Sequence, residues 1–210
     1  MIRPLPGPPW KNVTIMGKEN IVILKYNAGN ISSVYSALKR LGINALITGD
    51  KERIRSASKV IFPGVGEASS TMAYLRSNGM DRVISGLKQP VLGICLGMHL
   101  LCSFSGEGGT TGIGVFDEEV KRFVTGKVPH MGWNSVSGLK GPLFEGTVSG
   151  TYFYFVHSYY VPPGEYSVAE SNYGISFAAA MQRDNFFATQ FHPEKSGDEG
   201  EEILKRFIQL

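Results

Sequence analysis

Short apolar runs alternate with amphipathic segments through the first half of the chain. The apolar runs have the length and β-branched content of strands, and they cover residues 21–26, 45–48, 59–62 and 91–94. Residues 31–41 carry apolar side chains at helical spacing, and Gly42 follows in the position of a helix C-cap. Residues 69–76 and 81–87 are also predicted to be helical. Strands that alternate with helices predict an α/β fold, with a mostly parallel open sheet flanked by helices on both faces.

The second half of the chain has a different pattern, because aromatic residues, valines and turn residues dominate from residue 112 to 180. We predict strands near residues 120–123, 151–156, 167–172 and 177–181, as antiparallel hairpins added to the parallel sheet. A last apolar strand covers residues 186–191, and residues 199–209 form an amphipathic helix. We find no internal repeat and no linker, so residues 20–210 are predicted to form one domain.

Composition narrows the class of protein. Of the 210 residues, 42% are hydrophobic and 19% are charged, which supports a packed core and argues against general disorder. The formal net charge of +3 includes no run of Lys and Arg, so we expect no nucleic-acid partner. No stretch is apolar enough to span a membrane, so we expect no membrane association.

The N-terminal residues and the cysteines add two further expectations. Residues 1–19 are proline-rich and lack a long apolar core, which predicts a disordered extension rather than a secretory signal, with Met16 as an alternative start. If Cys95 and Cys102 share a helix, they lie about 10 Å apart, beyond the roughly 7 Å between Cα atoms that a disulfide allows. We therefore expect two free thiols and a cytoplasmic protein. We predict no cofactor and no metal.

The sequence Gly93-Ile-Cys-Leu-Gly97 has the pattern of a nucleophile elbow, in which a strand turns sharply into a helix and exposes the central residue. The two glycines keep side chains from colliding in the turn. The N–H of Leu96 can then face the oxyanion of a tetrahedral intermediate, and the helix N-terminus favours a thiolate at Cys95. The alternative is a buried structural cysteine beside two turn glycines.

A cysteine nucleophile needs a base and a leaving-group acid, which is usually histidine. The chain has four histidines: His99, His130, His157 and His192. We favour His192, because it ends an apolar strand, Pro193 holds it in an extended conformation, and Glu194 can orient the imidazole. In isolation this segment is also typical of a surface turn with a solvated glutamate.

A third segment, Pro63-Gly-Val-Gly66, ends the strand at residues 59–62. Its two glycines allow backbone N–H groups to turn toward a ligand, which predicts a second oxyanion donor. Alone it is no more than a loop. Ligand sites in open α/β sheets form at the carboxyl ends of the strands, so we expect all three segments to converge.

Together, GICLGM at residues 93–98, PGVG at 63–66 and FHPE at 191–194 resemble the class I (triad) glutamine amidotransferases, over nearly all of the chain from Ile21 onward. The resemblance implies a flavodoxin-like fold. PHMGWN at 129–134, YFVHS at 154–158 and Lys195 resemble one branch of that family. Its members supply ammonia to a (β/α)8-barrel cyclase that acts on a ribulosyl-aminoimidazole-type nucleotide.

The resemblance also implies roles for individual residues. Cys95 would attack the carboxamide of glutamine, and His192, oriented by Glu194, would transfer the protons. The oxyanion would be held by the backbone of Leu96, Gly64, Val65 and Gly66. The substrate pocket would include Gly97, His99, Glu107, His157 and Ser158. The interface with the cyclase, in a heterodimer, would include Asn30, Pro129, His130, Met131, Gly132, Trp133 and Lys195.

Some positions depart from the family pattern or allow another interpretation. His99 stands where the family usually has glutamine, so it is an alternative base or a ligand contact. Lys25 reverses the charge that an aspartate usually provides at the start of the first loop. The segment at 129–134 is either interface or a tightly packed turn in which the backbone satisfies His130, and His157 is a poor candidate for the base.

Three other functions remain open from the sequence. The first is a glutaminase subunit of another synthase, of the anthranilate or aminobenzoate type. The second is a stand-alone cysteine hydrolase or peptidase, which predicts robust turnover by the isolated chain. The third is a scaffold that keeps the triad without forming a thioester.

Overall fold

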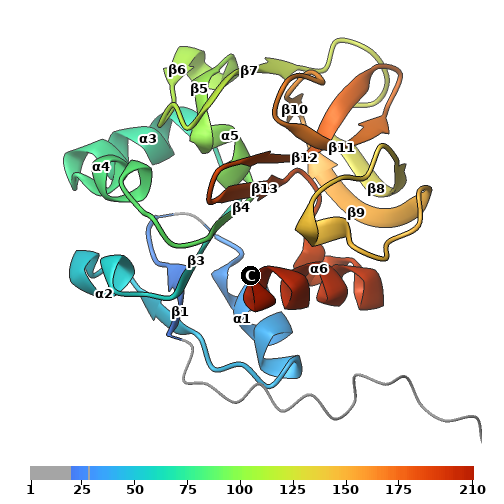
Figure 1. Cartoon of the computed structure of the whole chain (residues 1–210). Coiled ribbons are helices and arrows are strands. Elements are labelled where there is room, and N and C mark those ends of the chain that lie inside the picture. Colours follow the sequence, from blue (N-terminus) through green and yellow to red (C-terminus); the bar gives the residue numbers. More distant parts are fainter. Residues whose placement is uncertain (1–19, 28) are drawn as a thin grey trace, which may run out of the picture.

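The computed structural model describes residues 20–27 and 29–210, so the predictions for residues 1–19 lie outside the described part of the chain. Strands and helices alternate through the first half, as predicted (Figure 1). These elements are β1 (Ile21–Leu24), α1 (Ile31–Arg40), β2 (Leu46–Thr48), α2 (Lys51–Arg55), β3 (Lys59–Gly64), α3 (Ala68–Ser77), α4 (Met80–Ser85), β4 (Val91–Cys95) and α5 (Leu96–Leu101). The short helix α2 was not predicted; the carboxylate of Asp50 caps it by accepting a hydrogen bond from Arg53 N at 3.0 Å.

The second half is richer in strands than the sequence predicted. Its strands are β5 (Cys102–Ser105), β6 (Thr110–Thr111), β7 (Phe116–Arg122), β8 (His130–Val136), β9 (Thr151–His157), β10 (Tyr159–Tyr160), β11 (Ser167–Asn172), β12 (Ser176–Arg183) and β13 (Phe186–Thr189). Short 3-10 turns η2 (Glu107–Gly109), η3 (Pro142–Phe144) and η4 (Pro193–Lys195) connect some of them, and α6 (Gly197–Gln209) ends the chain.

The main sheet, as far as the chain is described, has seven strands in the order β11-β12-β13-β4-β3-β1-β2. The five strands from β13 to β2 are parallel, while β12 and β11 are antiparallel additions at one edge. This arrangement confirms the predicted fold class. Because parallel strands end at the same edge, the loops after β1, β3, β4 and β13 meet there.

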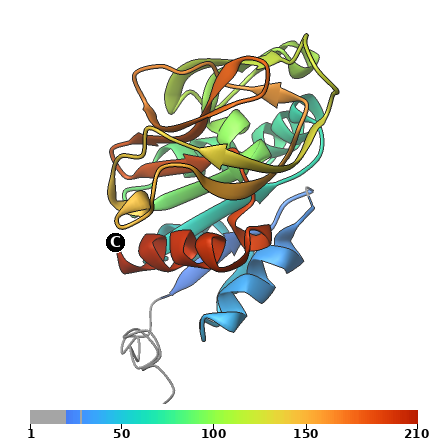
Figure 2. The same cartoon turned by 90° about the vertical axis from the view of Figure 1, so that its right-hand side faces the viewer.

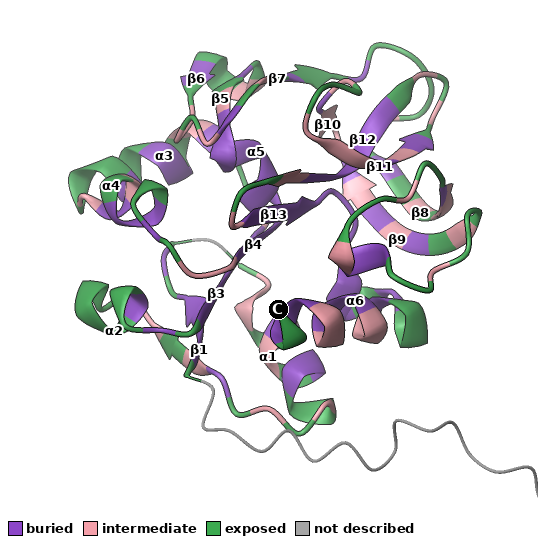
Figure 3. Cartoon of the chain, in the orientation of Figure 1, coloured by how far each residue is buried: buried purple, intermediate pink, exposed green. Residues whose placement is uncertain are grey.

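The alternation of side chains along β1 shows how the sheet divides two cores. Val22 and Leu24 pack with α3, α4 and α5, while Ile21 and Ile23 face the other side and pack with α1 and α6. The central strands are buried throughout (Figure 3), and α1 and α6 lie on the same side of the sheet (Figure 2). Strands covered on both faces explain the short, almost wholly apolar runs in the sequence.

The prediction for the second half was correct in one part and wrong in another. Strands β11 and β12 join the main sheet as expected. However, β7 belongs to a separate four-stranded sheet of the described chain, in the order β10-β7-β5-β6, and β9 pairs with β8 alone. Strand period alone does not say which sheet a strand joins, because the pairing depends on distant partners.

The interpretation of residues 129–134 as a tight turn is wrong. From His130 onward this segment forms strand β8, which pairs antiparallel with β9 over its whole length, from His130 opposite His157 to Val136 opposite Thr151. Gly132 lies within the strand at φ 132°, a conformation that favours glycine. The strand was not predicted because this segment contains a glycine and lacks the run of apolar residues found in the other strands.

Candidate active site

The predicted nucleophile elbow is present at the junction of β4 and α5. Cys95 has φ 54° and ψ −106°, an uncommon backbone conformation for a residue with a side chain. A Cβ added to Gly97 would lie 2.0 Å from the carbonyl oxygen of Phe62, and one added to Gly93 would lie 3.0 Å from the carbonyl carbon of Gly97. The turn therefore requires both glycines, as the sequence pattern predicted.

His192 follows β13, the neighbouring strand of β4, and its backbone is firmly held. Its N–H donates to Tyr154 O at 2.9 Å, and the hydroxyl of Ser196 donates to its carbonyl oxygen at 2.6 Å. The turn η4 brings Glu194 back, so that Oε1 lies 2.7 Å from His192 Nδ1. Both side chains are fully buried. Glu194 therefore fixes the ring with a proton on Nδ1, since a carboxylate only accepts.

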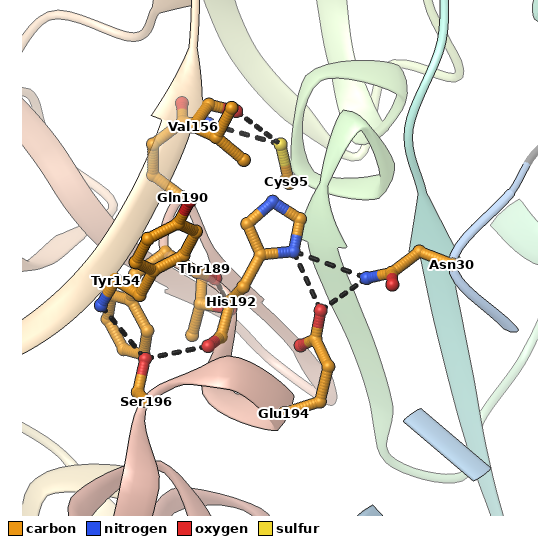
Figure 4. Close-up of polar contacts among 10 residues, drawn as sticks. Asn30, Cys95, Tyr154, Val156, Thr189, Gln190, His192, Glu194 and Ser196 are labelled. Carbon is orange, nitrogen blue, oxygen red and sulfur yellow. Dashed lines mark hydrogen bonds and ion pairs between the residues drawn. The ribbon is translucent and has the colours of Figure 1, made fainter. Parts of the chain in front are cut away.

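The other ring nitrogen of His192 is turned toward Cys95 (Figure 4). Nε2 forms no hydrogen bond to any described residue. Burial lowers the pKa of His192, but the negative charge and hydrogen bonding of Cys95, with those of Glu194, outweigh burial and raise the pKa above its usual value. This environment favours the protonated, imidazolium form of His192.

The segment Pro63–Gly66 lies directly beside the nucleophile. Gly64, the last residue of β3, is paired with Cys95 in the parallel register. A Cβ on Gly64 would meet the hydroxyl of Tyr26 at 2.6 Å and the Cβ of Leu96 at 3.0 Å, so the backbone approaches closely here. Gly66 has φ 130°. The structure thus brings this loop to the place where a second oxyanion donor would be needed.

A cavity of about 300 Å³ opens in front of Cys95. It combines residues from the predicted oxyanion and substrate groups with neighbours from the loop before β8 and from the end of β9. The lining residues are Val65, Gly66, Cys95, Leu96, His99, Glu107, Pro129, Val156, His157, Ser158 and Tyr159. Gly97 packs against Phe62 and does not line the cavity. His192 and Glu194 are buried and also do not line it.

Glu107 supplies a carboxylate to this cavity. Its Oε2 accepts a hydrogen bond from Ala68 N, at the start of α3, at 3.0 Å. Burial raises the pKa of Glu107, and the hydrogen bond from Ala68 opposes that rise. A half-buried carboxylate with one oxygen fixed can accept hydrogen bonds from an ammonium group of a ligand.

His99 has a local partner other than the nucleophile. Its Nε2 lies 2.7 Å from Oε1 of Gln190, and the amide nitrogen of Gln190 lies 3.8 Å from Cys95 Sγ (Figure 4). Since a thiolate accepts and an amide oxygen also accepts, the ring donates from Nε2. Burial lowers the pKa of His99 to about 4. Among the described residues, no carboxylate is hydrogen-bonded to this imidazole, so the geometry favours His192 over His99 as the base.

His130 and His157 form a buried pair between β8 and β9. Nδ1 of His157 must donate to the carbonyl oxygen of Tyr159 at 2.7 Å, so its Nε2 accepts from Nδ1 of His130 at 2.9 Å. The amide of Asn134 completes the chain at His130 Nε2, at 3.3 Å. Burial lowers the pKa of His157 to about 3 and of His130 to about 4. Both nitrogens of His157 are engaged, which argues against a role as base.

The residues predicted at the interface separate into three groups. Met131 and Trp133 are 63% and 55% exposed on β8, and Lys195 is exposed in η4. Pro129 lines the cavity, whereas His130 is buried. Asn30 is turned inward, and its side-chain amide donates to Glu194 (Figure 4).

Two polar residues near the site were missed in the sequence. Gln190 is fully buried and contacts Cys95, and the buried hydroxyl of Tyr26 donates to the carbonyl oxygen of Pro63. Burial raises the pKa of Tyr26. The available signal for Gln190 was an amide side chain inside the apolar run at 186–191, because a buried amide requires a partner.

Comparison with known proteins shows the family of this chain. The family model for class-I glutamine amidotransferases matches residues 22–210. The chain belongs to this family. Among its relatives, the imidazole glycerol phosphate synthase subunit HisH of Bacteroides fragilis is 58% identical over 194 residues, covering 90% of this chain and 99% of the relative. The HisH of Haemophilus influenzae is 48% identical over 193 residues, covering 90% and 97%.

A solved structure of a glutamine amidotransferase shares the fold of this amidotransferase, with a TM-score of 0.70 and 21% identity over 90% of this chain and 97% of that one. No helix in residues 20–27 or 29–210 is long and apolar enough to cross a membrane. Within the same residues, no three His, Cys, Asp or Glu side chains are grouped to hold a metal ion.

Proposed function

We propose that this amidotransferase is the glutaminase subunit of an imidazole glycerol phosphate synthase. It would hydrolyse glutamine to glutamate and ammonia and pass the ammonia to a cyclase subunit, which makes imidazole glycerol phosphate and AICAR in histidine biosynthesis. The observation that carries the proposal is the placement of Cys95 on a strained elbow, with the buried His192–Glu194 pair behind it and the cavity of Glu107 in front.

In the first half of the reaction, the thiolate of Cys95 attacks the carboxamide carbon of glutamine. The imidazolium of His192 gives its Nε2 proton to the amide nitrogen, the C–N bond breaks, and ammonia leaves a γ-glutamyl thioester on Sγ. The negative oxygen of each tetrahedral intermediate is held by the N–H of Leu96 and by the backbone of Gly64 to Gly66.

In the second half, His192 is neutral and takes a proton from a water molecule that attacks the thioester. Glutamate leaves, and the thiolate–imidazolium pair is restored. Glu194 accepts from Nδ1 in both halves and keeps the ring in one tautomer. Glu107 binds the α-ammonium group of glutamine, and the backbone of His157 and Ser158 lines the same pocket.

For the partner we propose a (β/α)8-barrel cyclase in a heterodimer with this chain. The support is the exposed apolar surface that Met131 and Trp133 form on β8, after Pro129, which lines the cavity; Lys195 is also exposed, in η4. Exposed aromatic and methionine side chains of this kind are enriched at interfaces. The two free cysteines support a reducing location, the cytoplasm.

The test is glutamine turnover by the purified chain, alone and with its cyclase and the nucleotide ligand, with Cys95→Ala as the blank. We expect low turnover alone, a sharp rise in the complex, and none in the variant. Equal turnover with and without the cyclase would favour a stand-alone hydrolase. If no thioester forms at Cys95 in the complex, the chain acts only as a scaffold for its partner.

A matched pair of variants tests the partner surface. Trp133→Ala should weaken cyclase binding, and Tyr74→Ala should not, because Tyr74 is also an exposed aromatic residue but lies on α3. Association is measured by titration calorimetry with the barrel cyclase. Equal binding by both variants would exclude the β8 surface as the interface. If the chain instead co-purifies with an anthranilate-type or aminobenzoate-type synthase, the histidine pathway is excluded.

A further inference from the structure

Asn30 occupies an N-cap position but does not cap its helix. It precedes α1 with φ 70° and ψ 5°, and its side chain makes no hydrogen bond to an N–H of the helix. An asparagine at this position usually accepts a hydrogen bond from the second or third residue of the helix. Asparagine and aspartate adopt a left-handed backbone more readily than other residues with a side chain. The backbone conformation accounts for an asparagine here, but not for the direction in which its side chain is turned.

The side chain of Asn30 instead contacts the catalytic pair (Figure 4). Its amide nitrogen donates to Oε1 of Glu194, the oxygen that also lies 2.7 Å from His192 Nδ1. The amide nitrogen and Nδ1 are 3.4 Å apart. Since Nδ1 donates its hydrogen bond to the carboxylate, Nδ1 and the amide nitrogen are two donors that approach the same oxygen. The carboxylate only accepts, so the amide must face it with its nitrogen.

The carboxylate of Glu194 has few other partners. Its side chain is fully buried, and Oε2 has no hydrogen bond to any described residue. Within the described chain, Asn30 and His192 are thus the donors to this side chain. His192 changes its charge during the proposed reaction, whereas the amide of Asn30 stays neutral and remains a donor. Without Asn30, the buried carboxylate would have His192 as its one donor, and the charge of that donor changes during the reaction. A carboxylate held in this way is poorly stabilised and can rotate.

We propose that Asn30 is a positioning residue of the triad, whose amide holds the carboxylate of Glu194 in the orientation that fixes His192. The inference rests on the proposed glutaminase function. It gives Asn30 a role within the subunit itself, in addition to any contact that its loop makes with a partner.

Two variants separate this role from the shape of the loop. Asn30→Asp keeps the size and the tolerance of the left-handed backbone but replaces the donor with a second carboxylate beside Glu194. Asn30→Gly removes the side chain, and glycine accepts φ 70° at no steric cost. Asn30→Gly should fold as stably as the wild type, whereas Asn30→Asp should lose some stability, because two carboxylates would meet in a buried site. Asn27→Gly, at an exposed position of the same loop, is the matched control.

The experiment measures glutamine turnover in the complex with the cyclase and its nucleotide ligand. For Asn30→Gly we expect kcat to fall on the order of 10- to 100-fold with KM unchanged, a smaller loss than the roughly 10⁴-fold that follows disruption of the orienting carboxylate in a serine-protease triad. Asn30→Asp should lose more than Asn30→Gly, because of the added repulsion. The low-field proton NMR signal of His192 Nδ1–H should shift or broaden in both.

Each outcome decides between the two proposals. Wild-type kcat in both Asn30 variants, a change in KM alone, or loss of folding in both would overturn the positioning role while leaving the glutaminase function in place. Absence of glutamine turnover in the wild-type complex would instead refute the proposed function. An equal loss in Asn27→Gly would assign the effect to the loop rather than to the amide.

Discussion

The buried histidine His157 should make the folded chain sensitive to mild acid. Burial is the main reason that its pKa is lowered to about 3, from its usual value of 6.5. Between these two pH values the unfolded chain binds a proton at this residue and the folded chain does not. Stability is therefore unaffected by His157 above pH 6.5 and falls as the pH decreases below it.

The size of this effect follows from the linkage relation. One proton of difference between the folded and unfolded states changes the free energy of unfolding by about 1.4 kcal/mol per pH unit. Between pH 6.5 and pH 5, His157 alone should therefore cost about 2 kcal/mol. Protonation would also break the hydrogen-bond chain, because Nε2 could no longer accept from His130.

The assay compares the wild type with His157→Asn by urea unfolding at pH 7.5 and at pH 5. Asparagine does not titrate, and its amide can still donate to the carbonyl oxygen of Tyr159. Whatever the variant costs at pH 7.5, its further loss on going to pH 5 should be about 2 kcal/mol smaller than that of the wild type. The comparison cancels the other titrating groups to a first approximation. If both proteins lose the same stability, His157 is not held neutral and the assigned hydrogen-bond chain is wrong.

Three further predictions concern the elbow, the thiols and the core. Gly97→Ala should unfold the elbow and abolish turnover, since the added Cβ would lie 2.0 Å from the carbonyl oxygen of Phe62. The control is Gly138→Ala, at φ 65° with open space around it. In a urea titration, this control should lower the free energy of unfolding by only about 1 kcal/mol. Iodoacetamide at pH 7 should modify Cys95 and not Cys102, because burial raises the pKa of the Cys102 thiol. The labelled residues are identified by mass spectrometry of the wild type and of Cys95→Ala. Labelling of the variant without denaturant would contradict the prediction. Phe191→Ala should lower the free energy of unfolding by about 3–5 kcal/mol, because the ring is fully buried and stacks on Phe153 at 4.2 Å; a loss below 1 kcal/mol would show that the site collapses around the gap.

The strands of the parallel sheet and the nucleophile elbow were predictable because their causes are local. Strands buried on both faces need short apolar runs, and a strand that turns into a helix at Cys95 needs glycine on either side. The carboxyl ends of parallel strands share an edge, so Gly64, Cys95 and His192 were expected to converge, although the order of the strands in the sheet was not predicted.

The partners of strands in the second half were decided by tertiary structure. The sequence predicted a strand at residues 151–156, but it did not show that this strand pairs with β8. The pairing buries His130 against His157, and each histidine then finds its hydrogen-bond partner across the two strands or beyond them. Such contacts depend on register between segments far apart in the chain, which local propensity does not encode.

The chemical environment of the site was likewise decided by contacts between distant segments. The sequence alone determined that Cys95 and His192 would stand at strand ends, with Glu194 two residues after the histidine. Only the folded chain brings Asn30, 164 positions earlier, onto Glu194 and sets Gln190 between His99 and Cys95. The physical reason is that burial removes water, so each polar group in the site must find its partner among the side chains that the fold places beside it.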